Sequence, residues 1–305
     1  MKRITFIRKG TFSILAMGLM FALLFSTSCK NTEKYPDDYG LALYTVRDAM
    51  NTDPVKTLHQ VADMGYSYVE AAGYNLEKGT FYGFSPEEFK KMCDEAGLKL
   101  VTSHTGVEQL LDENGDFDEA KATKMIDDHA RVGVKYLVNA HISDKYSGSV
   151  EGYKAIADAC NKLGEMAEKK GFGVLYHNHS FEFKPIGDTD GFTILTENLA
   201  PQLVNFELDC YWAEKAGKDP VTLITLYPGR FKALHLKDMT DDADKSFAEV
   251  GYGTMDYKAI IATGLKNGVE YFLVEQDRSK RDPMESARMS IDYLKKIDAE
   301  DQGNE

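Results

Sequence analysis

Residues 203–238 read LVNFELDCYWAEKAGKDPVTLITLYPGRFKALHLKD, and their pattern decides the fold. An apolar run, LVNFELDCYW, comes before the segment DPVTLITLYPG and a second apolar run, RFKALHLKD. An Asp-Pro start and a glycine stop are typical of a helix. The stretch therefore predicts a strand, a helix and a second strand, and strands joined in this way lie parallel in one sheet.

The same alternation begins at Tyr39 and continues into the C-terminal part of the chain. The expected strands lie at residues 39–46, 66–73, 98–106, 134–142, 172–179, 203–212, 230–238 and 269–277. The helical patterns lie at residues 53–65, 85–97, 118–133, 149–171, 190–200, 219–229, 256–268 and 282–297. Eight strand-then-helix units in about 260 residues predict a closed (β/α)8 TIM barrel in a single α/β domain. No GxGxxG follows the first strand, which argues against a dinucleotide-binding domain.

The first residues of the chain do not follow this pattern. A basic head that includes Lys2 and Arg3 is followed by the apolar run FSILAMGLMFALLF and by STSC, which ends at Cys29. This order is typical of a secretory signal, whose apolar core is shorter than a membrane-spanning helix requires. Small residues directly before a cysteine resemble a bacterial lipoprotein processing site, which would leave Cys29 as a lipidated N-terminus. An ordinary cleaved signal is the alternative.

We therefore divide the chain into four segments. Residues 1–28 are expected to be a lipoprotein signal peptide, 29–38 a tether, 39–298 the barrel and 299–305 a polar tail. The mature protein is then expected to be exported and anchored to a membrane by lipid, in the periplasm or on the cell surface.

Charge and cysteine content argue against several classes of partner and site. The formal net charge is −13, and it becomes −17 when residues 1–28 are removed, because they carry four positive charges and no negative one. Nucleic acids and anionic membrane surfaces bind clustered Lys and Arg, so neither is an expected partner. Cys93, Cys160 and Cys210 lie far apart without CxxC spacing, which indicates neither a disulfide framework nor a cysteine zinc site.

Polar side chains follow nearly every expected strand, and in a TIM barrel the functional groups project from these strand ends. They are Tyr44 and Arg47, Glu70, His104, Asn139 and His141, then His177, Asn178, His179 and Glu182, then Glu207 and Asp209, His235, Lys237 and Asp238, and finally Glu275 and Asp277. Five of the seven histidines fall in this set, and only His59 and His129 lie in expected helices. Five histidines converging on one rim predict a functional site there.

Three of these side chains have the chemistry of a metal site. Asp209, His235 and Glu275 offer two carboxylates and one imidazole, which suit Mn²⁺, Co²⁺, Mg²⁺, Fe²⁺ or Zn²⁺ in an open site. A fourth ligand is expected from the fifth strand, where Glu182 or His177 can supply it. Buried carboxylates without a cation are costly, which favours a metal; salt bridges to neighbouring basic side chains are the alternative.

Several motifs resemble the sugar phosphate isomerase/epimerase family of the xylose-isomerase-like barrel superfamily. The motifs are LALYTVRDAM, DPVKTLHQVADMGYSYVEAAG, YHNHSFEF, ELDCYW, HLKD, EVGYGTMDY and VEQD, and the resemblance spans about residues 39 to 297. The resemblance implies one divalent metal held by Glu, Asp, His and Glu on strands five to eight, and Asp209, His235 and Glu275 match the last three. Where ketose epimerases of the superfamily place the first glutamate, this chain has Tyr176 and His177.

The departure on the fifth strand leaves two assignments. We expect Glu182 to fold back as the first metal ligand, with His177 or His179 as the acid/base, and His177 as the alternative ligand. Lys237 completes the expected catalytic set. The expected substrate-binding residues are Tyr44, Glu70, His104, His141, Trp212 and Glu249.

The resemblance implies proton abstraction next to a carbonyl through a metal-stabilised enediolate, which gives isomerisation or epimerisation. Export and the lack of a glycine-rich phosphate cradle favour an unphosphorylated sugar or glycoside as substrate. One alternative is a 3-keto-glycoside lyase or hydrolase that cleaves by β-elimination after a partner sugar oxidoreductase has oxidised the substrate. An alternative of another class is a non-catalytic carbohydrate-binding lipoprotein.

Overall fold

A computed structural model describes Pro36 and residues 38–302. The expected signal peptide, Cys29 and most of the expected tether lie outside the described residues. Within residues 38–302, no helix is long and apolar enough to cross a membrane.

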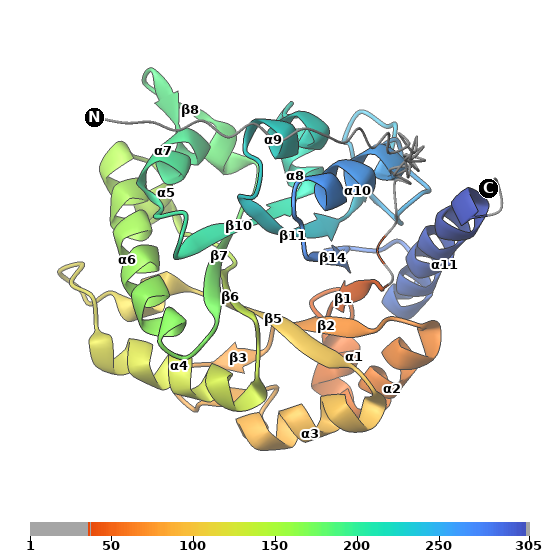
Figure 1. The fold of residues 1–305 in the computed structure, drawn as a ribbon, viewed down its shortest axis with the longest axis horizontal. Helices are drawn as coiled ribbons and strands as arrows, with labels where there is room; N and C mark the ends of the chain where they lie inside the picture. Colours follow the sequence, from red (N-terminus) through yellow and green to blue (C-terminus); the bar gives the residue numbers. More distant parts are fainter. Residues whose placement is uncertain (1–35, 37, 303–305) are drawn as a thin grey trace, which may run out of the picture. The chain divides into compact units, whose positions relative to one another are not determined.

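Eight parallel strands close into a barrel, as the alternating sequence predicts (Figure 1). In chain order the barrel strands are β1 (Gly40–Ala42), β2 (Tyr68–Ala71), β5 (Lys99–Thr105), β6 (Tyr136–Asn139), β7 (Gly173–His177), β10 (Val204–Asp209), β11 (Phe231–Leu236) and β14 (Tyr271–Val274). Each strand pairs in parallel with the next, and β14 pairs with β1 to close the barrel. The predicted (β/α)8 TIM barrel is therefore confirmed.

The eight predicted helices surround the barrel in the predicted order, and three short helices at residues 47–52, 144–147 and 210–215 were not predicted. They are α1 (Arg47–Thr52), α2 (Pro54–Met64), α3 (Pro86–Ala96), α4 (Glu119–Val132), α5 (Asp144–Ser147), α6 (Val150–Glu168), α7 (Gly191–Asn198), α8 (Cys210–Lys215), α9 (Pro220–Leu226), α10 (Tyr257–Lys266) and α11 (Pro283–Gln302), with 3₁₀ turns η1 (Val107–Leu110) and η2 (Phe181–Phe183). Local chemistry sets their ends: the side chains of Asp53 and Asp219 accept backbone N–H groups at the starts of α2 and α9. Ser85 and Glu88 form a capping box at the start of α3.

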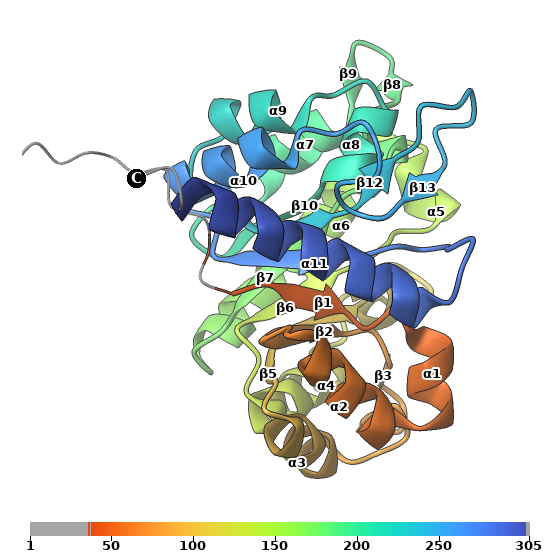
Figure 2. The same ribbon diagram turned by 90° about the vertical axis from the view of Figure 1, so that its right-hand side faces the viewer.

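Three short antiparallel hairpins that the sequence did not predict lie in the loops. They are β3 (Tyr74–Asn75) with β4 (Thr80–Phe81), β8 (Pro185–Ile186) with β9 (Thr189–Asp190), and β12 (Asp238–Met239) with β13 (Phe247–Ala248). Figure 2 shows the barrel from the side, with the arrow of β1 pointing toward the end where α1 and the β12–β13 hairpin lie. Several boundaries also differ from expectation: β1 ends at Ala42 instead of residue 46, β10 ends at Asp209 because α8 begins there, and α11 continues past residue 298 to Gln302.

An apolar layer fills the barrel below the site. Its buried members, one from each of six strands, are Tyr68, Val101, Val138, Leu175, Ala233 and Leu273. The Tyr68 hydroxyl donates to the Phe272 carbonyl at 3.1 Å and accepts the Phe272 N–H at 2.9 Å. A Cβ at Gly40 would lie 2.3 Å from the Tyr68 ring, so the glycine makes room for it. The polar side chains at the strand ends lie next to this buried apolar layer.

Candidate functional site

Buried polar side chains gather at the carboxyl ends of the barrel strands. They are Glu70 on β2, His104 on β5, His177 on β7, Glu207 and Asp209 on β10, His235 on β11, and Lys237 and Glu275 directly after β11 and β14. All but His104 are at most 4% exposed at the side chain, and His104 is 14% exposed. Parallel strands bring their carboxyl ends to one rim, which is why residues distant in sequence meet here.

Asp209, His235 and Glu275 form one of two groups of converging ligand atoms in this cluster. Their ligand atoms all lie within 4.8 Å of one another. The His235 Nδ1 atom lies 2.9 Å from Glu275 Oε2, and the Asp209 carboxylate is fully buried. The donor set therefore fits a divalent metal. The ammonium of Lys237 lies 2.8 Å from Asp209 Oδ2 and 2.6 Å from Glu275 Oε2, so this cation already faces the same two carboxylates.

A second group of ligand atoms lies beside the first and shares His235 with it. His104, His177, Glu207 and His235 place their ligand atoms within 4.8 Å of one another. Glu207 Oε2 lies 3.0 Å from His177 Nδ1 and 3.3 Å from His235 Nε2. Carboxylates in this position hold an imidazole by one nitrogen and leave the other for a metal. His177 Nε2 is then directed at Asp209 Oδ2, 3.7 Å away.

Glu207, like Asp277, is a cluster residue that our sequence reasoning named at a strand end but left out of the expected site. It is fully buried and also lies 3.5 Å from His104 Nε2, so it contacts three imidazoles. Glu207 and Asp209 are two residues apart on one strand, and side chains at this spacing share a face. The two-residue spacing between Glu207 and Asp209 was therefore the sequence signal that could have placed Glu207 in the site.

The charges of the cluster are strongly coupled. Burial alone would lower the pKa of His104, but Glu70 and Glu207 raise it to about 10. Burial likewise opposes the charge of Lys237, yet Asp209, Glu275 and Asp277 raise its pKa well above the usual value, so the ammonium stays charged.

Five carboxylates share this space with one lysine; they are Glu70, Glu207, Asp209, Glu275 and Asp277. Buried negative charge of this size requires protonated imidazoles or a bound cation. The cluster could therefore hold a metal ion.

Glu182 lies beneath the loop that follows β7. Its Oε1 accepts the Tyr176 hydroxyl at 3.0 Å, and its Oε2 accepts the backbone N–H of His179 at 2.8 Å. Burial raises the pKa of Glu182 to about 8. Its carboxylate belongs to neither group of converging ligand atoms in the described chain, so the structure does not bring the expected ligand Glu182 together with Asp209, His235 and Glu275.

An aromatic wall stands next to the cluster and consists of His141, His179, Phe181 and Trp212. The His179 ring stacks on Phe181 at 5.5 Å and lies 5.4 Å from His141 and 5.6 Å from Trp212. His179 Nδ1 and Trp212 Nε1 are buried without a hydrogen-bond partner in residues 38–302. Burial, together with the neighbouring His177 and Lys237, lowers the pKa of His179 to about 2, so its imidazole is neutral. The wall thus offers apolar faces and two unpaired polar atoms.

Two expected substrate-binding residues lie at the rim, away from the converging ligand atoms. Tyr44 is 37% exposed, and its ring lies 4.4 Å from the guanidinium carbon of Arg47. Glu249 accepts the Ser286 hydroxyl at 2.8 Å and pairs with Arg281 at 3.1 Å. The other four expected substrate-binding residues are in the cluster or the wall.

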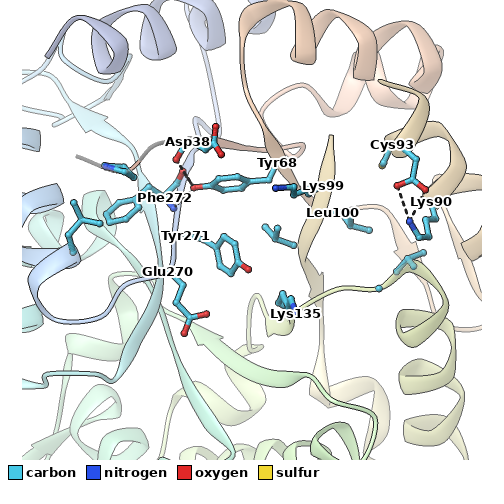
Figure 3. A pocket seen from close by; sticks show the side chains of 16 residues that line it. Asp38, Tyr68, Lys90, Cys93, Lys99, Leu100, Lys135, Glu270, Tyr271 and Phe272 are labelled. Atoms are coloured by element: carbon cyan, nitrogen blue, oxygen red, sulfur yellow. Dashed lines mark hydrogen bonds and ion pairs between the residues drawn. The ribbon is translucent and has the colours of Figure 1, made fainter. Parts of the chain in front are cut away.

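A cavity of about 570 Å³ lies at the opposite, amino end of the strands (Figure 3). Tyr68, Lys99, Tyr271 and Glu270 line it, and Asp38 lies at its edge. Neither group of converging ligand atoms includes a residue that lines this cavity. The candidate site is therefore at the carboxyl end.

Two relatives bear the name inosose dehydratase. The protein of Clostridium beijerinckii is 29% identical over 170 residues, which cover 50% of this chain and 56% of that protein, or just over half its length. The protein of Lacticaseibacillus casei is 24% identical over 258 residues, which cover 73% of this chain and 85% of that protein.

Solved structures share the barrel. A sugar phosphate isomerase/epimerase of Parabacteroides distasonis has a TM-score of 0.74 and 29% identity, with 88% of this chain and 95% of that chain covered. The 3-keto-D-glucoside 4-epimerase YcjR of E. coli has a TM-score of 0.57 and 19% identity over 79% of this chain and 94% of that chain. The IOLI protein, solved with a zinc atom, has a TM-score of 0.65 and 16% identity over 84% of this chain and 97% of that chain. The last two similarities concern the fold alone.

The family described as Xylose isomerase-like TIM barrel matches residues 58–297, which include seven of the eight barrel strands and the whole converging cluster. The chain therefore belongs to the xylose isomerase-like TIM barrel family.

Proposed function

We propose that this protein is a divalent-metal-dependent carbohydrate isomerase or epimerase that removes a proton next to a carbonyl. The observation that carries the proposal is the convergence of Asp209, His235 and Glu275 beside an aromatic wall with unpaired polar atoms. The names of the relatives, which include epimerases and dehydratases of sugars or cyclitols, support a carbohydrate-modifying enzyme. The zinc atom in the IOLI protein, which shares the barrel fold, supports a bound divalent metal.

His177 is the better candidate for the fourth metal ligand. Its Nδ1 is held by Glu207 at 3.0 Å, which leaves Nε2 directed toward Asp209. Glu182, by contrast, uses both carboxylate oxygens on Tyr176 and the His179 amide. We therefore assign the metal to Asp209, His235, Glu275 and His177. When bound, such a metal polarises the substrate carbonyl and stabilises the enediolate.

The two remaining catalytic candidates differ in what they can do with a proton. Lys237 stays protonated, so it can donate a hydrogen bond to a developing oxyanion but cannot serve as the base. His179 Nδ1 is buried and has no hydrogen-bond partner within residues 38–302, so on this geometry His179 is the candidate acid/base. Trp212, 5.6 Å from His179, offers a face for the apolar side of a sugar ring.

The second candidate reaction is β-elimination from a 3-keto-glycoside. It begins with the same proton abstraction, and the leaving group on the adjacent carbon departs instead of a proton returning. The keto-glucoside named for YcjR supports this class of substrate. An unphosphorylated sugar or glycoside, an exported location and a lipid anchor at Cys29 remain part of the proposal.

The test is NMR-monitored deuterium exchange in D₂O with Mn²⁺ or Co²⁺ and a panel of ketoses, aldoses and 3-keto-glycosides. We expect deuterium to enter one substrate, and we expect EDTA or Asp209→Asn to abolish the exchange. Return of the proton identifies an epimerase or isomerase, and release of an aglycone identifies a lyase. Bound metal and bound sugar without exchange would instead indicate a carbohydrate-binding protein.

A further inference from the structure

A separate pocket of about 520 Å³ borders the rim of the barrel between β1 and β14. Its lining includes the segment from Thr45 to Ala49, the segment from Gln276 to Ser279, and the start of α11. Asp277 joins the pocket to the catalytic cluster, since it lines the pocket and its Oδ2 lies 2.6 Å from Lys237 Nζ. The pocket therefore adjoins the converging cluster through the Asp277 side chain.

Arginine is concentrated at this pocket. The chain has six arginines after residue 28, and Arg47, Arg278 and Arg281 all line it. Arg281 is already paired, with Glu249 at 3.1 Å and Glu285 at 3.3 Å. The other two guanidinium groups have no carboxylate partner within the described chain, so their charges are available.

Arg47 is held in place without being neutralised. It donates to the backbone carbonyls of Tyr44 at 2.9 Å and Asp277 at 3.0 Å, and it stacks on the Tyr44 ring. The exposed Arg278 guanidinium makes no hydrogen bond or ion pair with residues 38–302.

Two of the three aspartates that line the pocket are also engaged. Asp277 pairs with Lys237, and Asp282 accepts the Met284 N–H at the start of α11. The carboxylate of Asp48 is exposed on α1. Three arginines and three aspartates line the pocket, and Arg47 and Arg278 are its two arginines without a carboxylate partner within residues 38–302, in a chain whose net charge is −13.

We propose that Arg47 and Arg278 form a subsite for an oxyanion carried by the substrate, at a position remote from the reacting carbonyl. The substrate class is then a sugar bearing a carboxylate, in keeping with the unphosphorylated substrate proposed above, and a sugar phosphate is the alternative that the test separates from it. Guanidinium groups bind both anions through paired, charge-assisted hydrogen bonds. The assignment rests on the proposed function, because the reacting end of the sugar is placed at the metal ligands.

The test compares the affinities of the full chain for D-glucose, D-glucuronate and D-glucose 6-phosphate by saturation-transfer NMR titration. Each titration is run with Mn²⁺ and again in EDTA, because an anion that binds only through the metal loses its advantage in EDTA. We expect at least one charged sugar to bind about tenfold more tightly than glucose under both conditions, as one charge-assisted hydrogen bond requires. Whichever charged sugar binds more tightly identifies the anion.

Arg47→Gln and Arg278→Gln are expected to remove most of this preference, whereas Arg288→Gln, an exposed arginine of α11 outside the pocket, is expected to leave it unchanged. Equal or undetectable binding of all three sugars, or a preference that survives Arg278→Gln, would overturn the subsite. Deuterium exchange on the same samples keeps the two proposals apart. A preference without exchange leaves the subsite standing and removes the proposed reaction.

Discussion

Glu207→Gln tests whether the buried Glu207 carboxylate supports the proposed metal site by holding the imidazoles of His177 and His235. Glu207 Oε2 lies 3.0 Å from His177 Nδ1 and 3.3 Å from His235 Nε2, so one oxygen holds both imidazoles. The amide keeps the size of the side chain but loses the charge that fixes both rings. Groups that orient metal-ligating histidines in this way typically contribute 10–100-fold to metal affinity, about 1.4–2.7 kcal/mol. We expect a loss of that size.

The assay is isothermal titration calorimetry with Zn²⁺ and Mn²⁺, in competition with a chelator of known affinity. Glu182→Gln is the matched control, because Glu182 is also a buried glutamate near β7 but contacts Tyr176 and the His179 amide instead. We expect it to bind metal within about threefold of the parent protein. Thermal melts of both variants check that the barrel is intact. Unchanged affinity in Glu207→Gln, or a larger loss in Glu182→Gln, would refute the assignment of ligands.

Two further predictions concern stability. Burial lowers the pKa of His129 from 6.5 to about 4. The neutral imidazole therefore contributes fully to the free energy of unfolding above pH 6.5, and this contribution is lost as the pH falls toward 4. We expect urea melts to show a loss of about 2–3 kcal/mol in the free energy of unfolding between pH 7.5 and pH 4.5. His129→Gln should show a shallower pH dependence, and an identical slope would contradict this account. The Asp238 carboxylate accepts four backbone N–H groups between residues 239 and 255, so Asp238→Asn should cost about 2–4 kcal/mol and speed hydrogen exchange in residues 250–255. Slow exchange in that variant would show that other contacts hold the loop.

The barrel could be predicted because helix starts, helix ends and apolar runs in the sequence all indicate the same fold. Asp53 and Asp219 start helices, Gly65 and Gly97 end helices with positive φ, and the apolar runs between them have strand length. Eight such repeats leave few alternatives to a closed parallel barrel. The predicted extent of β10 was wrong because the apolar residues Cys210, Tyr211 and Trp212 follow Asp209 without a turn signal. The Asp209 side chain accepts the Trp212 N–H and starts α8, so a cap overrides apolar continuity.

The candidate site could be predicted only for the residues that lie at the ends of barrel strands. His235 and Asp209 stand level on adjacent strands, so the alternation of strands and helices was enough to bring them together. Glu182 follows its strand by five residues, and spacing alone cannot say whether such a segment turns back into the mouth of the barrel. Here η2 tucks Glu182 under the loop, where its carboxylate holds Tyr176 and the His179 amide. The same residue therefore looks like a ligand in sequence and acts as a support in space.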